Sequence, residues 1–206
     1  MPEEMSTADQ EYAQRLERLQ NKRWKRVLDV QRPYRWNLRR LNLGKVLDVG
    51  CGRGRMLVSL PAGSVGVDHN PDLVRQAREA GCTAYTVDEF FADPAVSRPG
   101  SFDSLLAAHL IEHLQVDEAR QVLAGYLPMV RPGGTVVFIT PQERGYASDP
   151  THVVYTDHAA LQRLSQELGL MTVRQYSFPF PRWTGKLFIY NEFNHIARVG
   201  GERPAR

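Results

Sequence analysis

Cysteine is nearly absent from this sequence, and so is any long apolar run. The chain of 206 residues has only two cysteines, Cys51 and Cys82, too few for the disulfide framework of a small secreted protein. No stretch approaches the ~20 apolar residues that span a bilayer. The first residues combine neither a basic segment nor an apolar one, so they do not resemble a secretory signal. These absences favour a cytoplasmic protein that does not cross a membrane.

A strong overall excess of one charge is also missing, because the formal net charge is only +3. The positive charge is nevertheless concentrated, since residues 15–40 carry ten Lys or Arg against Glu17 and Asp29. This segment suits a solvated face of a helix, which helical spacing predicts over residues 8–30. It could also form a surface that attracts phosphate or an acidic substrate. The sequence leaves both interpretations open.

From residue 45 onward, short apolar runs alternate with helical periodicity. The predicted strands are 45–50, 64–68, 83–87, 102–108, 135–140, 171–178 and 187–199. The predicted helices are 55–60, 71–80, 117–130 and 157–168. The last two strands follow each other without a helix, which suggests antiparallel pairing. The pattern predicts an α/β fold with a Rossmann-like, doubly wound, mostly parallel seven-stranded sheet and an antiparallel last strand.

The length suits one domain with short extensions. We expect an N-terminal helical extension over residues 1–44, with a turn or helix end at Pro33, that could cap a substrate. The ligand-binding domain is expected over residues 45–199, and a disordered tail over 200–206. Residues 141–157 form a long polar connection after the fifth predicted strand, and such loops are often functional.

Three glycines follow the first predicted strand in Leu47-Asp-Val-Gly-Cys-Gly-Arg-Gly-Arg55. Glycine lets the backbone approach a ligand closely, and the N–H groups at the start of the predicted helix would favour an anion. At the carboxyl end of an open sheet, these features predict a ligand-binding loop. The spacing Gly50-x-Gly52-x-Gly54 misses the third glycine of the dinucleotide pattern, and no P-loop sequence follows.

An acidic residue, Asp68, ends the second predicted strand in Val65-Gly-Val-Asp-His-Asn70. A carboxylate there can accept hydrogen bonds from the hydroxyls of a ribose. The same segment also suits the start of a helix, because Asn70 before Pro71 is a good N-cap. The two roles are compatible.

Four segments together resemble the motifs of class I S-adenosylmethionine-dependent methyltransferases, within the type 11 or type 23 small-molecule branch. They are the glycine segment after the first strand, Val65–Asn70, Phe102–Leu114 and Leu127–Phe138. They occur in the family's order over residues 45–140. No subfamily is recognised in residues 1–44 or 141–206.

The resemblance implies S-adenosylmethionine as the cofactor and no metal. Asp48, Cys51 and the three glycines would hold the methionine part. Asp68 would bind the ribose hydroxyls, and His69 would lie beside the adenine.

Past the third strand, the resemblance places Asp88 near the adenine amino group, together with Glu89. Asp88 fits an ordinary loop carboxylate equally well. His109, just past the fourth strand, would lie beside the methionine part and face the acceptor.

Methyl transfer from a sulfonium is an in-line displacement, so alignment is the protein's main task and is worth ~7–11 kcal/mol in well-aligned systems. An acceptor that carries a proton also gains from a base, and histidine suits this role. The candidates are His109, His113 and His152. His113 also fits simple packing in the turn. Asp149 could orient His152, or it could stabilise the loop by Asp-Pro turn chemistry.

We therefore expect an enzyme that methylates an O or N atom of a small-molecule acceptor, as a monomer or homodimer. One alternative is an RNA-directed methyltransferase that uses residues 15–40, although no RNA-binding motif is present. Another is a non-catalytic partner protein with the same fold. A nucleotide-dependent oxidoreductase is disfavoured by the glycine spacing.

Overall fold

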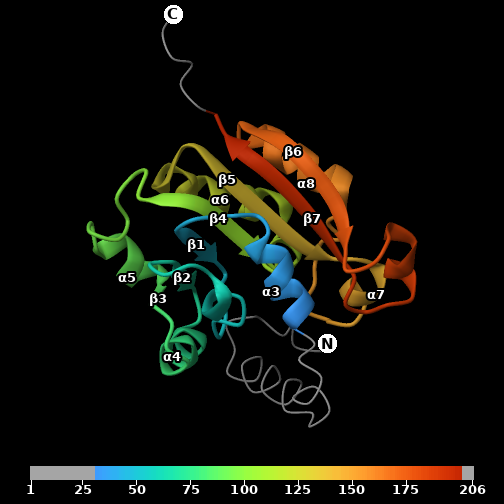
Figure 1. Cartoon of the computed structure of the whole chain (residues 1–206), viewed down its shortest axis with the longest axis horizontal. Coiled ribbons are helices and arrows are strands. Elements are labelled where there is room, and N and C mark those ends of the chain that lie inside the picture. The colour runs from blue at the N-terminus through green and yellow to red at the C-terminus, as the bar shows by residue number, and fades with distance from the viewer. Residues whose placement is uncertain (1–30, 201–206) are drawn as a thin grey trace, which may run out of the picture.

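In the described part of the chain, seven strands form one mixed sheet in the order β3-β2-β1-β4-β5-β7-β6 (Figure 1). The computed structural model describes residues 31–200 of the chain. The strands are β1 (Val46–Val49), β2 (Val65–Asp68), β3 (Ala84–Thr86), β4 (Phe102–Ala108), β5 (Val130–Pro141), β6 (Leu170–Phe178) and β7 (Glu192–Val199). Strands β1 to β5 pair in parallel, and β7 is antiparallel to both β5 and β6. The predicted doubly wound sheet and its antiparallel last strand are confirmed.

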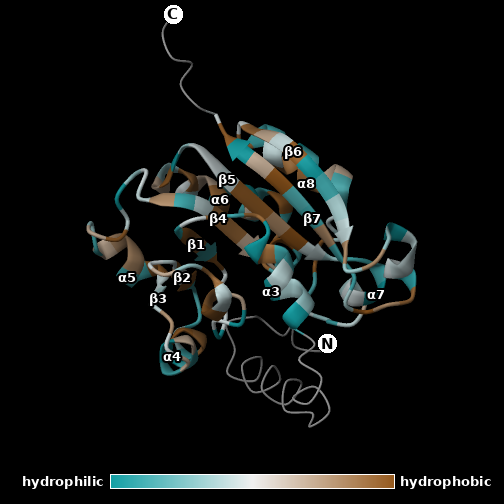
Figure 2. Cartoon of the chain, viewed as in Figure 1, coloured by the Kyte–Doolittle hydropathy of each residue, from teal (hydrophilic) through white to brown (hydrophobic). Residues whose placement is uncertain are grey.

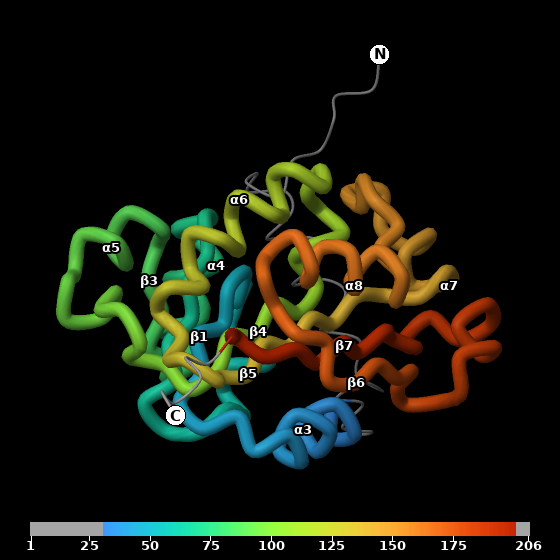
Figure 3. The backbone as a smooth tube through the Cα atoms, turned by 90° about the horizontal axis from the view of Figure 1, so that it is seen from above, coloured from blue at the N-terminus to red at the C-terminus, as the bar shows by residue number. Residues whose placement is uncertain are grey.

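Helices cover both faces of this sheet. They are α3 (Arg32–Arg39), α4 (Pro71–Glu79), α5 (Val87–Ala92), α6 (Val116–Tyr126), α7 (Glu143–Tyr146) and α8 (His158–Glu167). Single 3-10 turns occur at η1 (Leu57–Ser59), η2 (Ile111–His113), η3 (Leu127–Met129) and η4 (Arg182–Lys186). Figure 3 shows α6 and α8 on one side of the sheet and α3 on the other. None of the helices within residues 31–200 has the length and apolar character of a membrane span.

The two core layers explain why the central strands are apolar almost without interruption. Successive residues of a strand point to opposite faces. Leu105 of β4 therefore joins the layer under α6 and α8, and Leu106 joins the layer under α3; both are completely buried. Burial of each such side chain stabilises the folded state by roughly 1.5–3 kcal/mol. Figure 2 shows the apolar character of β5 at the centre of the sheet.

The segment around Pro33 is helical, which corrects the turn or helix end predicted at this residue. Proline is tolerated in the first turn of a helix because its missing N–H has no intrahelical partner there. Leu38 of α3 is buried in the core, and Asn37 Nδ2 donates to Asn194 Oδ1 on β7 at 2.8 Å. The end of the N-terminal extension thus covers one face of the sheet. The helix predicted over 8–30 and tail residues 201–206 lie outside the described residues, and the domain boundaries stay a prediction.

Three local predictions were wrong in extent. The helix predicted over 55–60 is only the 3-10 turn η1. The third strand ends at Thr86, because Thr86 and Glu89 form a capping box that starts α5. The last strand begins at Glu192 rather than at 187, since η4 and a turn precede it. The long polar connection predicted over residues 141–157 contains the short helix α7.

His195 on β7 is expected to make stability depend on pH. The imidazole is completely buried, accepts a hydrogen bond from Gln175 Nε2 at 2.9 Å and lies 2.8 Å from Ser165 Oγ. Burial lowers its pKa to about 4. The unfolded chain binds a proton near pH 6.5, whereas the native imidazole stays neutral until about pH 4. The neutral, buried imidazole therefore makes its full contribution to the free energy of unfolding above pH 6.5. This contribution falls by up to ~3 kcal/mol as the pH is lowered toward 4.

Urea unfolding of the wild type and of His195→Gln between pH 7.5 and 4.5 measures this effect. The difference in unfolding free energy between the two proteins should shrink as the pH falls. Contributions from other titrating groups cancel in that difference. Parallel pH profiles would contradict the assignment.

Candidate functional site

Reactive side chains gather at the carboxyl edge of the sheet. The glycine loop follows β1, Asp68 ends β2 and His109 follows β4. Glu192 joins them from the start of β7, because this strand is antiparallel and pairs Glu192 with Pro141 at the end of β5. Strand order reverses between β1 and β4, and open α/β sheets bind ligands at such a switch point.

The glycine loop has a shape that side chains would not permit. Gly50, Gly52 and Gly54 all have positive φ, at 74°, 55° and 76°. A Cβ added at Gly54 would lie 2.8 Å from Cys82 Sγ, so this glycine allows close packing of the loop. A Cβ added at Gly52 would meet no atom within 4 Å. Gly52 therefore borders open space that a ligand can occupy.

Asp68 connects this loop to the next strand. Its side chain is 6% exposed, its Oδ2 accepts from Gly52 N at 2.8 Å and its Oδ1 accepts from Asn70 N at 2.9 Å. Two accepted bonds leave a carboxylate with capacity for further donors. Asn70 accepts from the backbone of Asp72 and Leu73 and caps α4. Both proposed uses of this segment, an acidic ligand group and a helix cap, are therefore compatible with the geometry.

Asp48, in β1, carries an unusual buried oxygen. Its side chain is 2% exposed, and its Oδ2 has no hydrogen-bond partner among the described residues. Burial, followed by the nearby charge of Asp68, raises the pKa of Asp48 to about 7. Buried carboxylate oxygens almost always have a partner. An unpaired one beside an open glycine loop suits a donor or a cationic group of a ligand.

These three features fit S-adenosylmethionine. Gly52 offers space for close approach, Asp48 can receive a positively charged group, and Asp68 can accept from ribose hydroxyls. The backbone N–H groups that follow β1 belong to turns and to the 3-10 turn η1. The prediction that they belong to the start of an α-helix was therefore wrong.

The three residues predicted to lie near the adenine differ in their surroundings. His69 is half exposed, with Nδ1 3.5 Å from Asp68 Oδ1. Asp88 is exposed in the first turn of α5. Glu89 is already committed to the capping box with Thr86 and to a 2.6 Å bond from Arg78. The cofactor roles of His69 and Asp88 stay predictions, whereas a structural role accounts for Glu89.

His109 lies between two buried carboxyl groups. Its Nδ1 is 3.2 Å from Glu112 Oε1, and its Nε2 is 2.9 Å from Glu192 Oε1. Burial lowers the pKa of His109, but the bonds to the two acids raise it more, to about 9. The imidazole then carries protons on both nitrogens near neutral pH and has no lone pair for another proton. This geometry favours His109 as a residue that positions carboxyl groups over its predicted role as the base.

Glu192 was given no catalytic role by the sequence reasoning. Its side chain is nearly buried, and its Oε2 has no hydrogen-bond partner among the described residues. The ion pair to His109 holds the other oxygen. Burial, followed by the charge of Glu192, raises the pKa of the nearby Tyr34. Glu192 thus holds a buried carboxyl oxygen without a hydrogen-bond partner among the described residues, at the edge of the sheet where the glycine loop lies.

The other two predicted bases, His113 and His152, lie against each other. Their ring centroids are 4.7 Å apart. Burial lowers the pKa of His113. The ring of His152 bonds the carbonyl of Tyr146 at 2.8 Å, and Asp149 Oδ1 accepts from the backbone and hydroxyl of Thr151. Asp149 therefore acts in the loop turn, as the second of the two interpretations had it.

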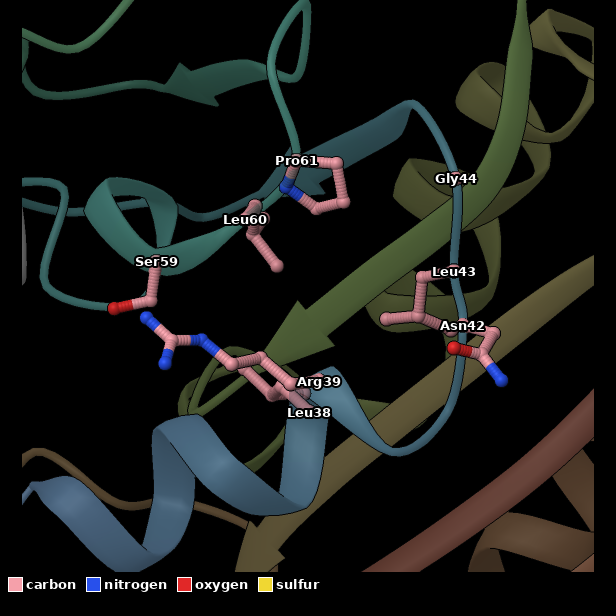
Figure 4. Close-up of a pocket in the computed structure, with 8 residues that line it drawn as sticks. All are labelled: Leu38, Arg39, Asn42, Leu43, Gly44, Ser59, Leu60 and Pro61. Atoms are coloured by element: carbon pink, nitrogen blue, oxygen red, sulfur yellow. The ribbon is translucent and has the colours of Figure 1, made fainter.

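A separate cavity of about 430 Å³ lies at the other end of β1 (Figure 4). It is lined by Leu38, Arg39, Asn42, Leu43, Gly44, Ser59, Leu60 and Pro61. These residues come from α3, from the link into β1, and from the end of η1 and the two residues after it. The cavity is thus remote from the glycine loop and contains none of the predicted site residues.

Known proteins with the same arrangement identify the domain. Residues 46–134 match a family model described as a methyltransferase domain. The solved magnesium protoporphyrin IX methyltransferase of Synechocystis PCC 6803 has a TM-score of 0.64 over 94% of this chain and 97% of that one, at 14% identity. Residues 46–134 thus match a methyltransferase domain, and the described chain has the fold of the class I methyltransferases. A SAM-dependent methyltransferase from Archaeoglobus fulgidus, with a TM-score of 0.62, 20% identity and coverage of 80% and 92%, shares the fold of this domain.

Curated relatives match about half of this chain. A ubiquinone biosynthesis O-methyltransferase from Methylococcus capsulatus is 35% identical over 47% of this chain and 43% of that protein. One from Xanthomonas euvesicatoria is 30% identical over 56% and 50%. The match thus spans about half the length of these relatives. The family model ends at residue 134, so it includes the glycine loop and His109 but neither His152 nor Glu192.

Proposed function

We propose that this chain is an enzyme that transfers the methyl group of S-adenosylmethionine to a hydroxyl oxygen of a small-molecule acceptor. The observation that carries the proposal is the placement of the glycine loop, with its unpaired Asp48 oxygen, and the His109–Glu192 pair at one sheet edge. The partial likeness to ubiquinone biosynthesis O-methyltransferases supports an oxygen acceptor.

The cofactor half of the site uses residues of β1 and β2. S-adenosylmethionine supplies a methyl group on a positively charged sulfur. Asp68 accepts from the ribose hydroxyls while it keeps Gly52 in place. Asp48 favours a cationic group of the ligand, because such a group restores charge balance at a buried carboxyl.

The acceptor half uses Glu192. Its Oε2 would accept the hydrogen bond of the acceptor hydroxyl and take the proton as the oxygen–methyl bond forms and the methyl–sulfur bond breaks. His109 donates to Oε1 and so fixes the orientation of the carboxyl group. A base positioned in this way contributes typically ~10²–10⁴-fold to the rate.

We also propose that the enzyme works in a reducing compartment such as the cytoplasm, with a small-molecule substrate rather than RNA. Cys51 and Cys82 are both free thiols, which suits such a compartment. A monomer or homodimer would suffice, since residues 31–200 of one chain supply both halves of the site.

Calorimetric titration of the purified protein with S-adenosylmethionine, S-adenosylhomocysteine and NADH tests the cofactor half. We expect micromolar binding of both sulfur compounds and none of NADH. Failure of both sulfur compounds to bind, or tight binding of NADH, would overturn the proposal.

Labelled S-adenosylmethionine and paired acceptors that differ only in a hydroxyl or an amino group test the acceptor half. Transfer to the hydroxyl member of each pair is expected. Transfer confined to amines would contradict the assigned acceptor atom.

A further inference from the structure

A second cluster of polar side chains lies next to the site already described. Glu112 and His113 come from η2, and His152 comes from the connection after α7. One ligand atom from each of the three residues lies within 4.8 Å of the other two. We propose that these residues bind a divalent transition-metal ion, with Zn²⁺ as the best fit. The proposal does not depend on methyl transfer.

Glu112 supplies the first observation. Its side chain has no exposed surface. Its Oε1 lies 3.2 Å from the His109 ring, but its Oε2 is buried without a hydrogen-bond partner among the described residues. A buried carboxylate oxygen without a partner is costly. A bound cation would compensate for this loss of solvation.

The two imidazoles supply the second observation. His113 Nδ1 lies 3.2 Å from Thr151 O, and His152 Nδ1 lies 2.8 Å from Tyr146 O. A carbonyl oxygen can only accept, so each Nδ1 carries the proton and each Nε2 carries the lone pair. Metal-binding histidines are commonly oriented by such a bond from the other ring nitrogen to a carbonyl.

The backbone holds the loop against η2. Val153 N and Val154 N both donate to Glu112 O, at 2.8 and 3.2 Å. The hydroxyl of Thr151 lies 3.1 Å from His113 Nδ1 and donates to Asp149. These bonds connect the two segments that supply the ligands. The cluster is therefore assembled before any ion binds.

The ligand chemistry selects the metal. Two imidazole nitrogens and one carboxylate oxygen suit Zn²⁺ and its spectroscopic substitute Co²⁺, whereas Mg²⁺ and Ca²⁺ prefer oxygen ligands throughout. Three protein ligands leave at least one coordination position for water or another small ligand. Glu112 would then connect the ion to His109 through its other oxygen.

Calorimetry of the chelator-treated full chain with ZnCl₂ tests the proposal. We expect one equivalent of Zn²⁺ with micromolar or tighter affinity, no response to MgCl₂, and visible absorption bands on addition of CoCl₂. His152→Ala should weaken Zn²⁺ binding by at least ~10–100-fold, the range seen even for lost outer contacts of metal sites. His69→Ala, which removes a half-exposed imidazole elsewhere, is the matched control and should bind Zn²⁺ as the wild type does.

Absence of Zn²⁺ binding by the wild type would overturn the proposal, as would equal binding by His152→Ala. The cobalt spectrum of the wild type gives a readout that does not require the variant to fold. Titration of the same samples with S-adenosylmethionine keeps the two proposals separate, because either site can fail while the other binds.

Discussion

Replacement of Glu192 by Gln is expected to lower kcat by ~10²–10⁴-fold, the usual contribution of a positioned base. The amide preserves the size of the side chain but cannot accept the proton of an acceptor hydroxyl. Because Glu192 lies on β7, outside the glycine loop and β2, the affinity for S-adenosylmethionine should stay close to that of the wild type. Initial rates at saturating cofactor, together with calorimetric cofactor titration, measure the two quantities separately.

Glu167→Gln is the matched control for this experiment. Glu167 ends α8 and is exposed, so the same chemical change there should leave kcat unaltered. A Glu192→Gln enzyme with wild-type kcat would exclude Glu192 as the proton acceptor. An equal loss of kcat and of cofactor affinity would instead indicate a structural role for the His109–Glu192 pair.

The parts of the site that follow a strand directly could be predicted from the sequence. A buried apolar run that stops at glycine places Gly50, Gly52 and Gly54 at the carboxyl edge, and Asp68 follows by the same logic. The reason is that parallel strands all end at one edge, whatever the intervening helices do. The number of strands was predictable from the alternation of apolar runs with helical periodicity, and the antiparallel last strand from the absence of a helix between the last two strands.

The distant partner of His109 could not be found in this way. Glu192 is 83 residues away in the sequence, and it meets His109 only because β7 runs antiparallel and begins where β4 ends. His152 likewise reaches η2 through the bonds of Val153 and Val154 to Glu112 O. Such contacts depend on strand register and loop docking, which no local pattern specifies.

Two other errors had local signals that were available. Thr86-x-x-Glu89 is a capping-box sequence, and it marks the start of α5 that was taken for strand. Pro33 suits the first turn of a helix as well as a helix end. Burial of Leu38 against β4 and β5 favours a helix that begins near Pro33, and such packing is a tertiary effect that the local sequence does not show.

Asp68→Ala is expected to weaken S-adenosylmethionine binding by at least ~100-fold. Hydrogen bonds to a charged group are worth roughly 1.5–3 kcal/mol each, and the ribose has two hydroxyls to donate. The change also removes the acceptor of Gly52 N, so the glycine loop loses the contact that ties it to β2. Asp68→Asn, which keeps the shape and one acceptor oxygen, should weaken binding less than Asp68→Ala does.

Calorimetric titration measures these affinities, and Asp117→Ala is the matched control because its side chain is 82% exposed on α6. Urea unfolding of each variant separates loss of a ligand contact from loss of the fold. If Asp68→Ala folds as the wild type does and binds S-adenosylmethionine within about threefold of it, Asp68 does not hold the ribose, and the cofactor must be held by the glycine loop and Asp48. A selective loss, graded from Asn to Ala, would instead place the ribose at the end of β2, since only a carboxylate at that position both orients the loop and accepts from a diol.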